Sequence, residues 1–253
     1  MKNISNKKAT DKLIFALDAN DYEEALHWIE LLSGYVGMFK VGKELFTAVG
    51  PRIIRDIKER SQKVFLDLKF HDIPNTVARA AEAAVKLNVD MFNVHASGGS
   101  QMIKESVLAA QTCSDKLGQT RPVFLAVTVL TSLSDDDLKR IGFQKNTKEL
   151  VLHLAGLAKD AGASGVVASP QDIAILRENF GNEFVIVTPG IRGASEMKKD
   201  DQKRTLSAYE AIKTGADYIV VGRPIRAADK PLEACRQIVQ EIAEGLAAKI
   251  IRE

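Results

Sequence analysis

Charged residues that could transfer a proton follow an apolar run at positions 64–66. The segment DLKFHD at 67–72 continues directly from VFL, which has the composition of a buried strand. Because side chains alternate along an extended strand, Asp67 and Lys69 are expected on one face. Charges persist inside a protein where they are paired or used in chemistry, so this segment indicates proton transfer or charge stabilisation. The alternative is a surface ion pair at the end of a strand.

The elements that position these residues alternate between short apolar runs and longer amphipathic ones. Nearly continuous apolar runs are typical of parallel strands covered on both faces. Asp21 and Thr147 are placed to be helix N-caps. The predicted strands are 13–17, 38–41, 63–68, 91–95, 123–129, 165–168, 184–187 and 218–221, and the predicted helices are 21–32, 44–59, 76–87, 100–116, 147–161, 170–179, 207–214 and 231–249.

Eight strand–helix units in about 250 residues predict an α/β protein with a (β/α)₈ TIM barrel. The competing fold is a doubly wound open sheet, but the first strand leads into LDAN at 17–20 and not into a G-x-G-x-x-G turn. We expect one domain over 1–253. Residues 1–11 are predicted to be a flexible tail, and the long irregular stretch 190–204 is predicted to be a lid over the active site.

The composition narrows the class of protein. An apolar share of 45% and a charged share of 27% are typical of a globular enzyme, and a net charge of +2 without a basic block argues against nucleic-acid binding. No apolar run is long enough to span a membrane, and the N-terminus lacks the apolar core of a signal peptide. We therefore expect a cytoplasmic protein whose two cysteines, Cys113 and Cys235, are reduced thiols.

The sequence contains no metal-binding motif, because its histidines are scattered and its cysteines lack a ligand spacing. Asp67 and Asp72 could still hold Mg²⁺, which takes few protein ligands. Lys69 already supplies a positive charge beside them, which makes a metal less necessary. We expect no metal and no organic cofactor.

In a barrel, polar residues at the carboxyl ends of the strands are the candidates for the active site. Lys40 lies inside an apolar strand, and its alternative role is a structural ion pair. His95 could equally be a core histidine, and Thr131 with Ser132 could form an ordinary turn. The candidates by position are Asp18, Lys40, Asp67, Lys69, Asp72, His95, Thr131, Ser132, Gly222 and Arg223.

The residues after the last predicted strand indicate a phosphate-binding site. Barrels often bind phosphate through the loops that follow strands seven and eight. Gly222 permits close approach of the backbone, and Arg223 offers a planar, two-pronged donor. Arg192 and Gln202 in the predicted lid could close over the same group. The alternative is a glycine-containing loop with an exposed arginine.

With these motifs in place, the chain resembles the orotidine 5′-monophosphate decarboxylase family over residues 13–227. The segment DLKFHDIPNT at 67–76 is the most specific of the matching motifs. The charged tetrad expected of the family is complete in Lys40, Asp67, Lys69 and Asp72. The other matching segments are FALD at 15–18, FKVG at 39–42, VTVLTS at 127–132, TPGIR at 188–192, DDQ at 200–202 and GRP at 222–224.

The resemblance implies a carbon–carbon lyase that converts orotidine 5′-monophosphate to uridine 5′-monophosphate and CO₂ in de novo pyrimidine biosynthesis. It implies no metal and no cofactor, and a homodimer in which Asp72 and Thr76 reach the neighbouring site. The implied roles are proton delivery to C6 by Lys69, positioning of Lys69 by Asp67 and Asp72, ribose contacts by Lys40 and Asp18, recognition of the pyrimidine amide edge by Thr131 and Ser132, and phosphate binding by Arg192, Gln202, Gly222 and Arg223.

Three alternatives stay open. An Mg²⁺-dependent 3-keto-gulonate 6-phosphate decarboxylase uses a similar Asp-x-Lys-x-x-Asp strand on the same barrel. A Schiff-base aldolase is disfavoured, because Lys69 between carboxylates is a poor nucleophile. A non-catalytic nucleotide-binding barrel would retain the charged tetrad without using it for chemistry.

Overall fold

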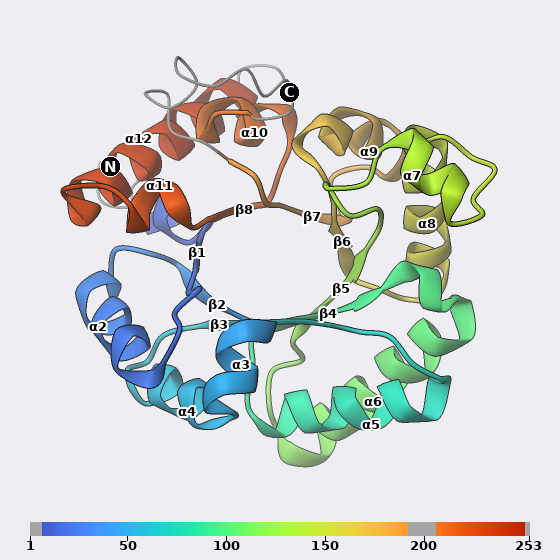
Figure 1. Cartoon of the computed structure of the whole chain (residues 1–253), viewed down its shortest axis with the longest axis horizontal. Helices are drawn as coiled ribbons and strands as arrows, with labels where there is room; N and C mark the ends of the chain where they lie inside the picture. Colours follow the sequence, from blue (N-terminus) through green and yellow to red (C-terminus); the bar gives the residue numbers. More distant parts are fainter. Residues whose placement is uncertain (1–6, 192–205, 251–253) are drawn as a thin grey trace. The chain divides into compact units, whose positions relative to one another are not determined.

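The computed structural model describes residues 7–191 and 206–250, and within them eight parallel strands form a closed barrel in chain order (Figure 1). The predicted (β/α)₈ fold is therefore confirmed. The predicted runs at 91–95 and 218–221 match their strands at both ends. The strands are β1 (Leu13–Ala16), β2 (Met38–Gly42), β3 (Val64–Phe70), β4 (Met91–His95), β5 (Val123–Val127), β6 (Gly165–Val167), β7 (Val185–Thr188) and β8 (Tyr218–Val221).

Helices follow the strands along the chain. Asp21 caps the first of them, since its side chain accepts a hydrogen bond from the Glu24 N–H, as predicted. The helices are α2 (Tyr22–Leu32), α3 (Lys43–Val49), α4 (Arg52–Glu59), α5 (Pro74–Lys86), α6 (Ser100–Leu117), α7 (Asp135–Arg140), α8 (Thr147–Asp160), α9 (Ile173–Phe180), α10 (Ala208–Thr214), α11 (Arg223–Arg226) and α12 (Pro231–Ile250), with short 3₁₀ turns at Ala96–Gly98 and Pro170–Asp172.

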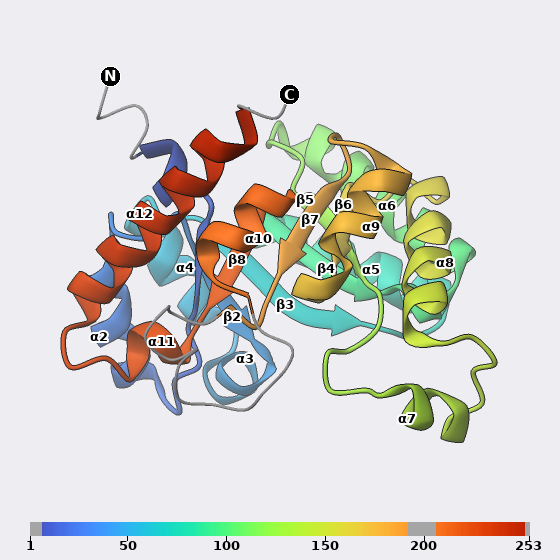
Figure 2. The same ribbon diagram turned by 90° about the horizontal axis from the view of Figure 1, so that it is seen from above.

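The chain divides into two compact units. The first unit is Met1–Asp67 together with Thr188–Glu253, and the second unit is Leu68–Val187. In the first unit β1 pairs with β2 and with β8, and β2 pairs with the first residues of β3. Phe15 packs its ring against Trp28 and Phe39 in the core of this unit, and α10 lies against α12 (Figure 2).

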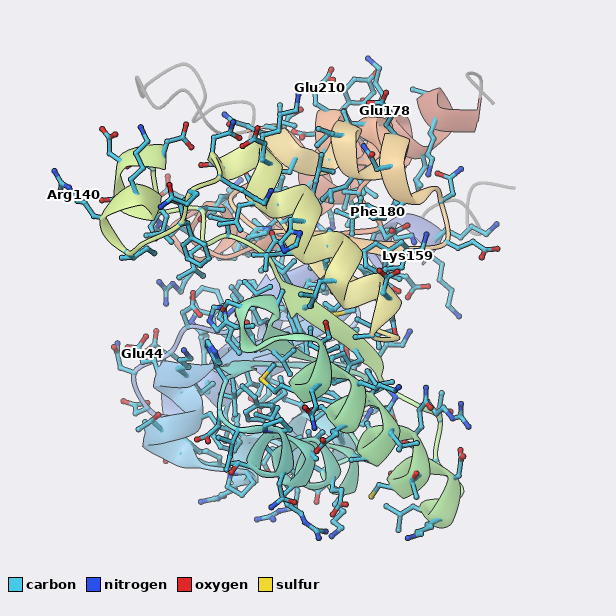
Figure 3. All side chains as sticks on the ribbon, turned by 90° about the vertical axis from the view of Figure 1, so that its right-hand side faces the viewer. Glu44, Arg140, Lys159, Glu178, Phe180 and Glu210 are labelled. Carbon is cyan, nitrogen blue, oxygen red and sulfur yellow. The ribbon has the colours of Figure 1, made fainter. Side chains whose placement is uncertain are left out.

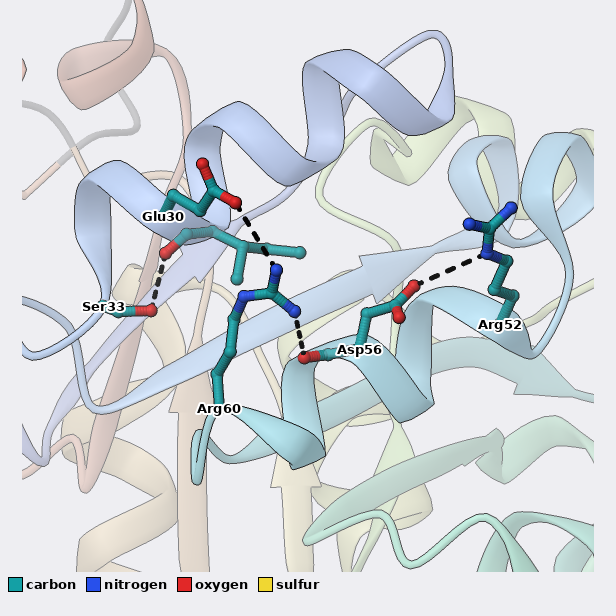
Figure 4. A network of polar contacts seen from close by, with 6 residues as sticks. Glu30, Ser33, Arg52, Asp56 and Arg60 are labelled. Carbon is teal, nitrogen blue, oxygen red and sulfur yellow. Dashed lines mark hydrogen bonds and ion pairs between the residues drawn. The ribbon is translucent and has the colours of Figure 1, made fainter.

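Polar contacts tie α2 to α4 on the outside of the first unit (Figure 4). Arg60 donates to the main-chain oxygen of Asp56 at 2.9 Å and lies 3.4 Å from the carboxylate of Glu30. Arg60 ends α4, and β3 begins four residues later. These contacts therefore fix the approach of the chain to the strand that carries Asp67.

In the second unit β4, β5, β6 and β7 pair in that order. Its core includes an aromatic row in which Phe92 contacts both Phe70 and Phe124, with ring centroids 6.3 and 5.0 Å apart. On the outside, Lys159 near the end of α8 donates to the main-chain oxygen of Phe180 at 3.3 Å. Figure 3 labels both residues. None of the helices in the described residues is long and apolar enough to cross a membrane.

Several predicted boundaries were wrong for local reasons. The helix predicted over 44–59 is two helices, because Gly50 turns to a φ of +72° and Pro51 cannot continue the hydrogen-bond ladder. The N-cap of α8 is Asn146 and not Thr147. Asn146 forms a capping box with Glu149, which satisfies two backbone N–H groups. The helices α7 and α11 were not predicted, since both are too short to show an apolar period.

The predicted tail and lid are described only in part. Residues 7–10 form a helical turn in which Ala9 is fully buried, which differs from a flexible tail over 1–11. Gly190 and Ile191 are described, while Arg192, Gln202 and the rest of the predicted lid lie outside the described residues.

Candidate functional site

The first unit brings three predicted site residues together around one ammonium group. Lys40 Nζ lies 3.3 Å from Asp18 Oδ1 and 3.4 Å from Asp67 Oδ2. The side chains of Lys40 and Asp67 are only 11% and 12% exposed, whereas that of Asp18 is 43% exposed. Lys40 is therefore nearly buried, as expected of a residue inside an apolar strand, and it forms an ion pair with each of the two carboxylates.

The strand register explains this cluster. Lys40 on β2 stands opposite Ala16 on β1 and opposite Phe65 on β3, while Asp67 stands opposite Gly42. The long lysine side chain spans the two-residue offset to Asp67, and Asp18 lies just beyond the end of β1. Since the strands are parallel, these side chains meet at the carboxyl ends, where barrels place their active sites.

Two glycines leave room for this cluster. A Cβ atom on Gly42 would lie 3.1 Å from Lys40 Nζ and 3.8 Å from Asp18 Oδ1. A Cβ atom on Gly222 would lie 3.2 Å from the Cβ of Ala16 and 3.6 Å from Asp18 Oδ2. Gly42 was missed as a site residue, because a glycine at the end of a strand carries no chemical signal of its own.

In the second unit Lys69 has a backbone φ of +52°, in the left-handed region. This conformation costs a non-glycine residue roughly 1–2 kcal/mol. The expectation that Asp67 and Lys69 share one face assumed an extended strand, and the backbone at Lys69 departs from that conformation. The strand predicted to end at residue 68 runs on to Phe70 and contains this turn.

The main-chain N–H of Lys69 donates to the Oδ1 atom of Asn93 at 2.8 Å. Asn93 is fully buried on β4. It was not predicted as a site residue, although a polar side chain within the apolar run MFNV at 91–94 is a signal that could have identified it. A buried amide of this kind is expected to be hydrogen-bonded, and here it serves the backbone of the predicted proton donor.

The residues after Lys69 lead to an exposed corner. The His71 ring lies 5.6 Å from the ring of His95, which is only partly buried. Asp72 accepts a hydrogen bond from the Ile73 N–H at 2.7 Å and is exposed, as is Thr76 in the first turn of α5. Ile73 is 67% exposed, the highest value among the large apolar side chains described.

Thr131 and Ser132 lie in an exposed turn after β5, followed by α7. Ser134 and Asp137 form a capping box at the start of α7, and Asp135 accepts hydrogen bonds from both the N–H and the hydroxyl of Thr147. Figure 2 shows α7 beyond the first turn of α8. The hydrogen bond from the Ser134 hydroxyl holds the pKa of Asp137 below its usual value.

Arg223 begins α11 directly after Gly222 and is exposed. Arg192 and Gln202, the other predicted phosphate ligands, lie outside the described residues. In the described parts of the chain, no three His, Cys, Asp or Glu side chains are grouped so that they could hold a metal ion.

Comparison with known proteins identifies the family to which the chain belongs. Residues 11–238 match the model of the orotidine 5′-phosphate decarboxylase / HUMPS family. The chain belongs to this family. Because that description also names a second group, the curated relatives are needed to separate the two.

The chain is 54% identical to the orotidine 5′-phosphate decarboxylase of Syntrophus aciditrophicus over 98% of this chain and 99% of that protein. It is 49% identical to the enzyme of the same name from Geotalea daltonii, over 96% of this chain and all of that protein. A crystal structure of the orotidine 5′-phosphate decarboxylase from Lactobacillus acidophilus matches with a TM-score of 0.79 and 40% identity, over 91% of this chain and 98% of that one.

The predicted family is therefore confirmed over nearly the whole chain. The family assignment does not itself test the individual site residues, and the structure shows the following contacts among them and their neighbours. Within the first unit the structure joins Lys40 with Asp18 and Asp67. Within the second unit it joins Lys69 with Asn93 and His71 with His95.

Proposed function

We propose that this chain decarboxylates orotidine 5′-monophosphate to uridine 5′-monophosphate and CO₂, with Lys69 as the proton donor to C6. The observation that carries the proposal is the arrangement on β2 and β3. The ammonium of Lys40 is held by Asp18 and Asp67, and Lys69 follows Asp67 by two residues on the same strand. The curated relatives that bear this activity in their names support the same reaction.

The reaction needs electrostatic help from the protein. Loss of CO₂ from C6 leaves a carbanion in an sp² orbital, which the pyrimidine ring cannot delocalise as a cofactor electron sink would. Charges that are already in place when the carbanion forms lower the barrier, because they need no reorganisation during the reaction. Lys69 combines a compact positive charge with a transferable proton. Asp67 and Asp72 are assigned to hold its ammonium at C6.

Lys40 and Asp18 are assigned to the ribose. Asp18 is the more exposed of the two carboxylates on Lys40, so one side of it is open to a hydroxyl donor. Lys40 is fixed by both carboxylates and can donate a further hydrogen bond without moving. Together they would orient the sugar and so place C6 of the ring.

The remaining substrate contacts are assigned by position in the chain. Thr131 and Ser132 are assigned to the N–H and C=O groups of the pyrimidine edge, and their exposure leaves both hydroxyls accessible. Gly222 and Arg223, with Arg192 and Gln202, are assigned to the phosphate. Binding energy from the phosphate, which is remote from C6, can be used to lower the barrier at C6.

The active form is proposed to be a homodimer in which Asp72 and Thr76 reach the site of the neighbouring subunit. Asp72, Ile73 and Thr76 are all exposed, and an isoleucine that is 67% exposed beside a functional carboxylate fits a surface that a second copy covers. The absence of a cofactor and the cytoplasmic location stay predictions.

An ultraviolet assay with orotidine 5′-monophosphate in EDTA tests the reaction. We expect turnover by the wild-type chain and a loss of most of kcat in Lys69→Ala. A variant that kept kcat within about tenfold, or roughly 1.4 kcal/mol of barrier, would overturn the role of Lys69. Absence of turnover on the nucleotide, with Mg²⁺-dependent decarboxylation of 3-keto-gulonate 6-phosphate instead, would favour the 3-keto-gulonate 6-phosphate decarboxylase. Tight nucleotide binding without turnover would favour a binding protein.

Mixing two inactive variants tests the shared site. Lys69→Ala and Asp72→Asn chains would form heterodimers in which one of the two sites has both native side chains. Random exchange of subunits should then restore about one quarter of the wild-type activity. If activity stayed absent after exchange had been verified by mass spectrometry, Asp72 would act within its own subunit.

A further inference from the structure

We infer that Asn93 is a positioning residue, whose side-chain amide locks the backbone of Lys69 in its left-handed conformation and thereby aims the ammonium group. This inference rests on the proposed role of Lys69 as the proton donor. Asn93 Oδ1 accepts the Lys69 N–H at 2.8 Å, and Asn93 itself is fully buried.

The backbone of Lys69 needs an external acceptor. A φ of +52° turns the Cα–Cβ bond and the following peptide of Lys69 away from the directions that an extended strand gives them relative to its N–H. A backbone N–H left without a partner in the interior would be unfavourable, so a side-chain oxygen must replace the carbonyl that a strand ladder supplies. Asn93 supplies that oxygen from β4, and its own backbone stands opposite Leu125 on β5, which fixes its position.

Neighbouring contacts hold the same segment against the β4 region. Phe70 packs its ring on Phe92, and His71 faces His95 with ring centroids 5.6 Å apart. A Cβ atom on Gly98, just after β4, would lie 3.3 Å from the His71 ring, so the backbone there is close to the histidine. Three successive residues, 69 to 71, are therefore each fixed by β4, and strained backbone persists where its surroundings over-determine it.

The consequence is specific to catalysis. Lys69 has four rotatable side-chain bonds, so the direction of its Cα–Cβ bond decides which volume its ammonium can reach. If the backbone relaxed to an extended φ, that bond would turn away while substrate contacts elsewhere stayed in place. Loss of the Asn93 oxygen should therefore reduce kcat and leave KM nearly unchanged.

The kinetic test compares three variants with the wild-type chain. Asn93→Ala removes the acceptor, Asn93→Asp keeps an oxygen at the same position, and Ser106→Ala removes an equally buried hydrogen bond, to the main-chain oxygen of Met102, away from the site. We expect kcat to fall about 30- to 100-fold in Asn93→Ala with KM changed less than about threefold. Asn93→Asp should recover only part of kcat, because it keeps the oxygen but buries a carboxylate in place of the amide. Ser106→Ala should match the wild type. A folded Asn93→Ala with kcat within about threefold of wild type would overturn the inference.

Amide hydrogen exchange, followed by NMR, tests the contact without relying on activity or on a variant that folds. In the wild-type chain the Lys69 amide should exchange at least about 100-fold more slowly than an unprotected amide. Free exchange at Lys69 would overturn the inference even if the decarboxylase reaction were established. Conversely, a protected amide in a chain that does not decarboxylate the nucleotide would leave the backbone contact intact and refute the proposed function.

Discussion

Lys40 Nζ lies 3.4 Å from Asp67 Oδ2, and both side chains are almost nine-tenths buried. Removing one partner of such a pair leaves the other charge poorly solvated, which is more unfavourable than losing a surface pair. Lys40 is also shared with Asp18, so its removal affects two carboxylates at once.

Lys40→Met is therefore expected to lower the free energy of unfolding by about 3 kcal/mol, in addition to its effect on activity. The matched control is Lys230→Met, because Lys230 and Glu233 are closer, at 3.1 Å, but their side chains are 72% and 55% exposed. Lys230→Met should lower the free energy of unfolding by less than about 1 kcal/mol. Urea unfolding measures the free energy of unfolding of both variants. Equal decreases in the two would show that burial of the Lys40 pair does not add to stability.

The left-handed backbone of Lys69 predicts an unusual order of stability. Lys69→Gly should be more stable than Lys69→Ala by about 1 kcal/mol, because glycine adopts a positive φ without strain. At Lys104, an exposed residue within α6, the order should reverse, since glycine disfavours a helix interior by a similar amount. Thermal or urea unfolding of the four variants checks this. If the alanine variant were more stable than the glycine variant at both positions, Lys69 would carry no backbone strain.

Gly42→Ala should disturb the charged cluster. A methyl group there would lie 3.1 Å from Lys40 Nζ, which is tighter than an ordinary contact, and the ammonium must shift. We expect kcat/KM to fall about tenfold or more, since small displacements at a reacting centre are costly. Gly156→Ala in α8, where the nearest atoms would be 3.9 Å away, should keep full activity and stabilise its helix. Unchanged steady-state kinetics in Gly42→Ala would show that the cluster tolerates the shift.

The capping box of α7 predicts a dependence on acid. Hydrogen bonds from the Ser134 hydroxyl and N–H lower the pKa of Asp137. Because the folded pKa is below the unfolded value of about 3.9, the cap is fully stabilising above that pH and is lost as the pH falls through the folded pKa. An NMR titration should find Asp137 below its usual range. Asp137→Asn should weaken the acid dependence of α7, whereas Asp136→Asn, outside the capping box, should not.

The fold could be predicted to a large extent from local pattern. Continuous apolar runs such as 91–95 mark strands covered on both faces, and their spacing by amphipathic segments of helical length leaves the barrel as the arrangement that buries them all. Local pattern failed where one or two residues override it. Gly50 and Pro51 break a helix that the apolar period alone would continue, and α7 is too short to have a period at all.

The charged residues of the site could also be predicted from the sequence by itself, because lysines and aspartates are uncommon within apolar strands. The types of these side chains also restrict the chemistry that they can perform. Only the tertiary structure decided how they are held. The pairing of Lys40 with both Asp18 and Asp67 depends on the register between strands, which no single segment encodes. The left-handed turn at Lys69 depends on an amide 24 residues away on β4. Such a conformation is disfavoured locally, so it can be stabilised only by contacts that form when the chain has folded.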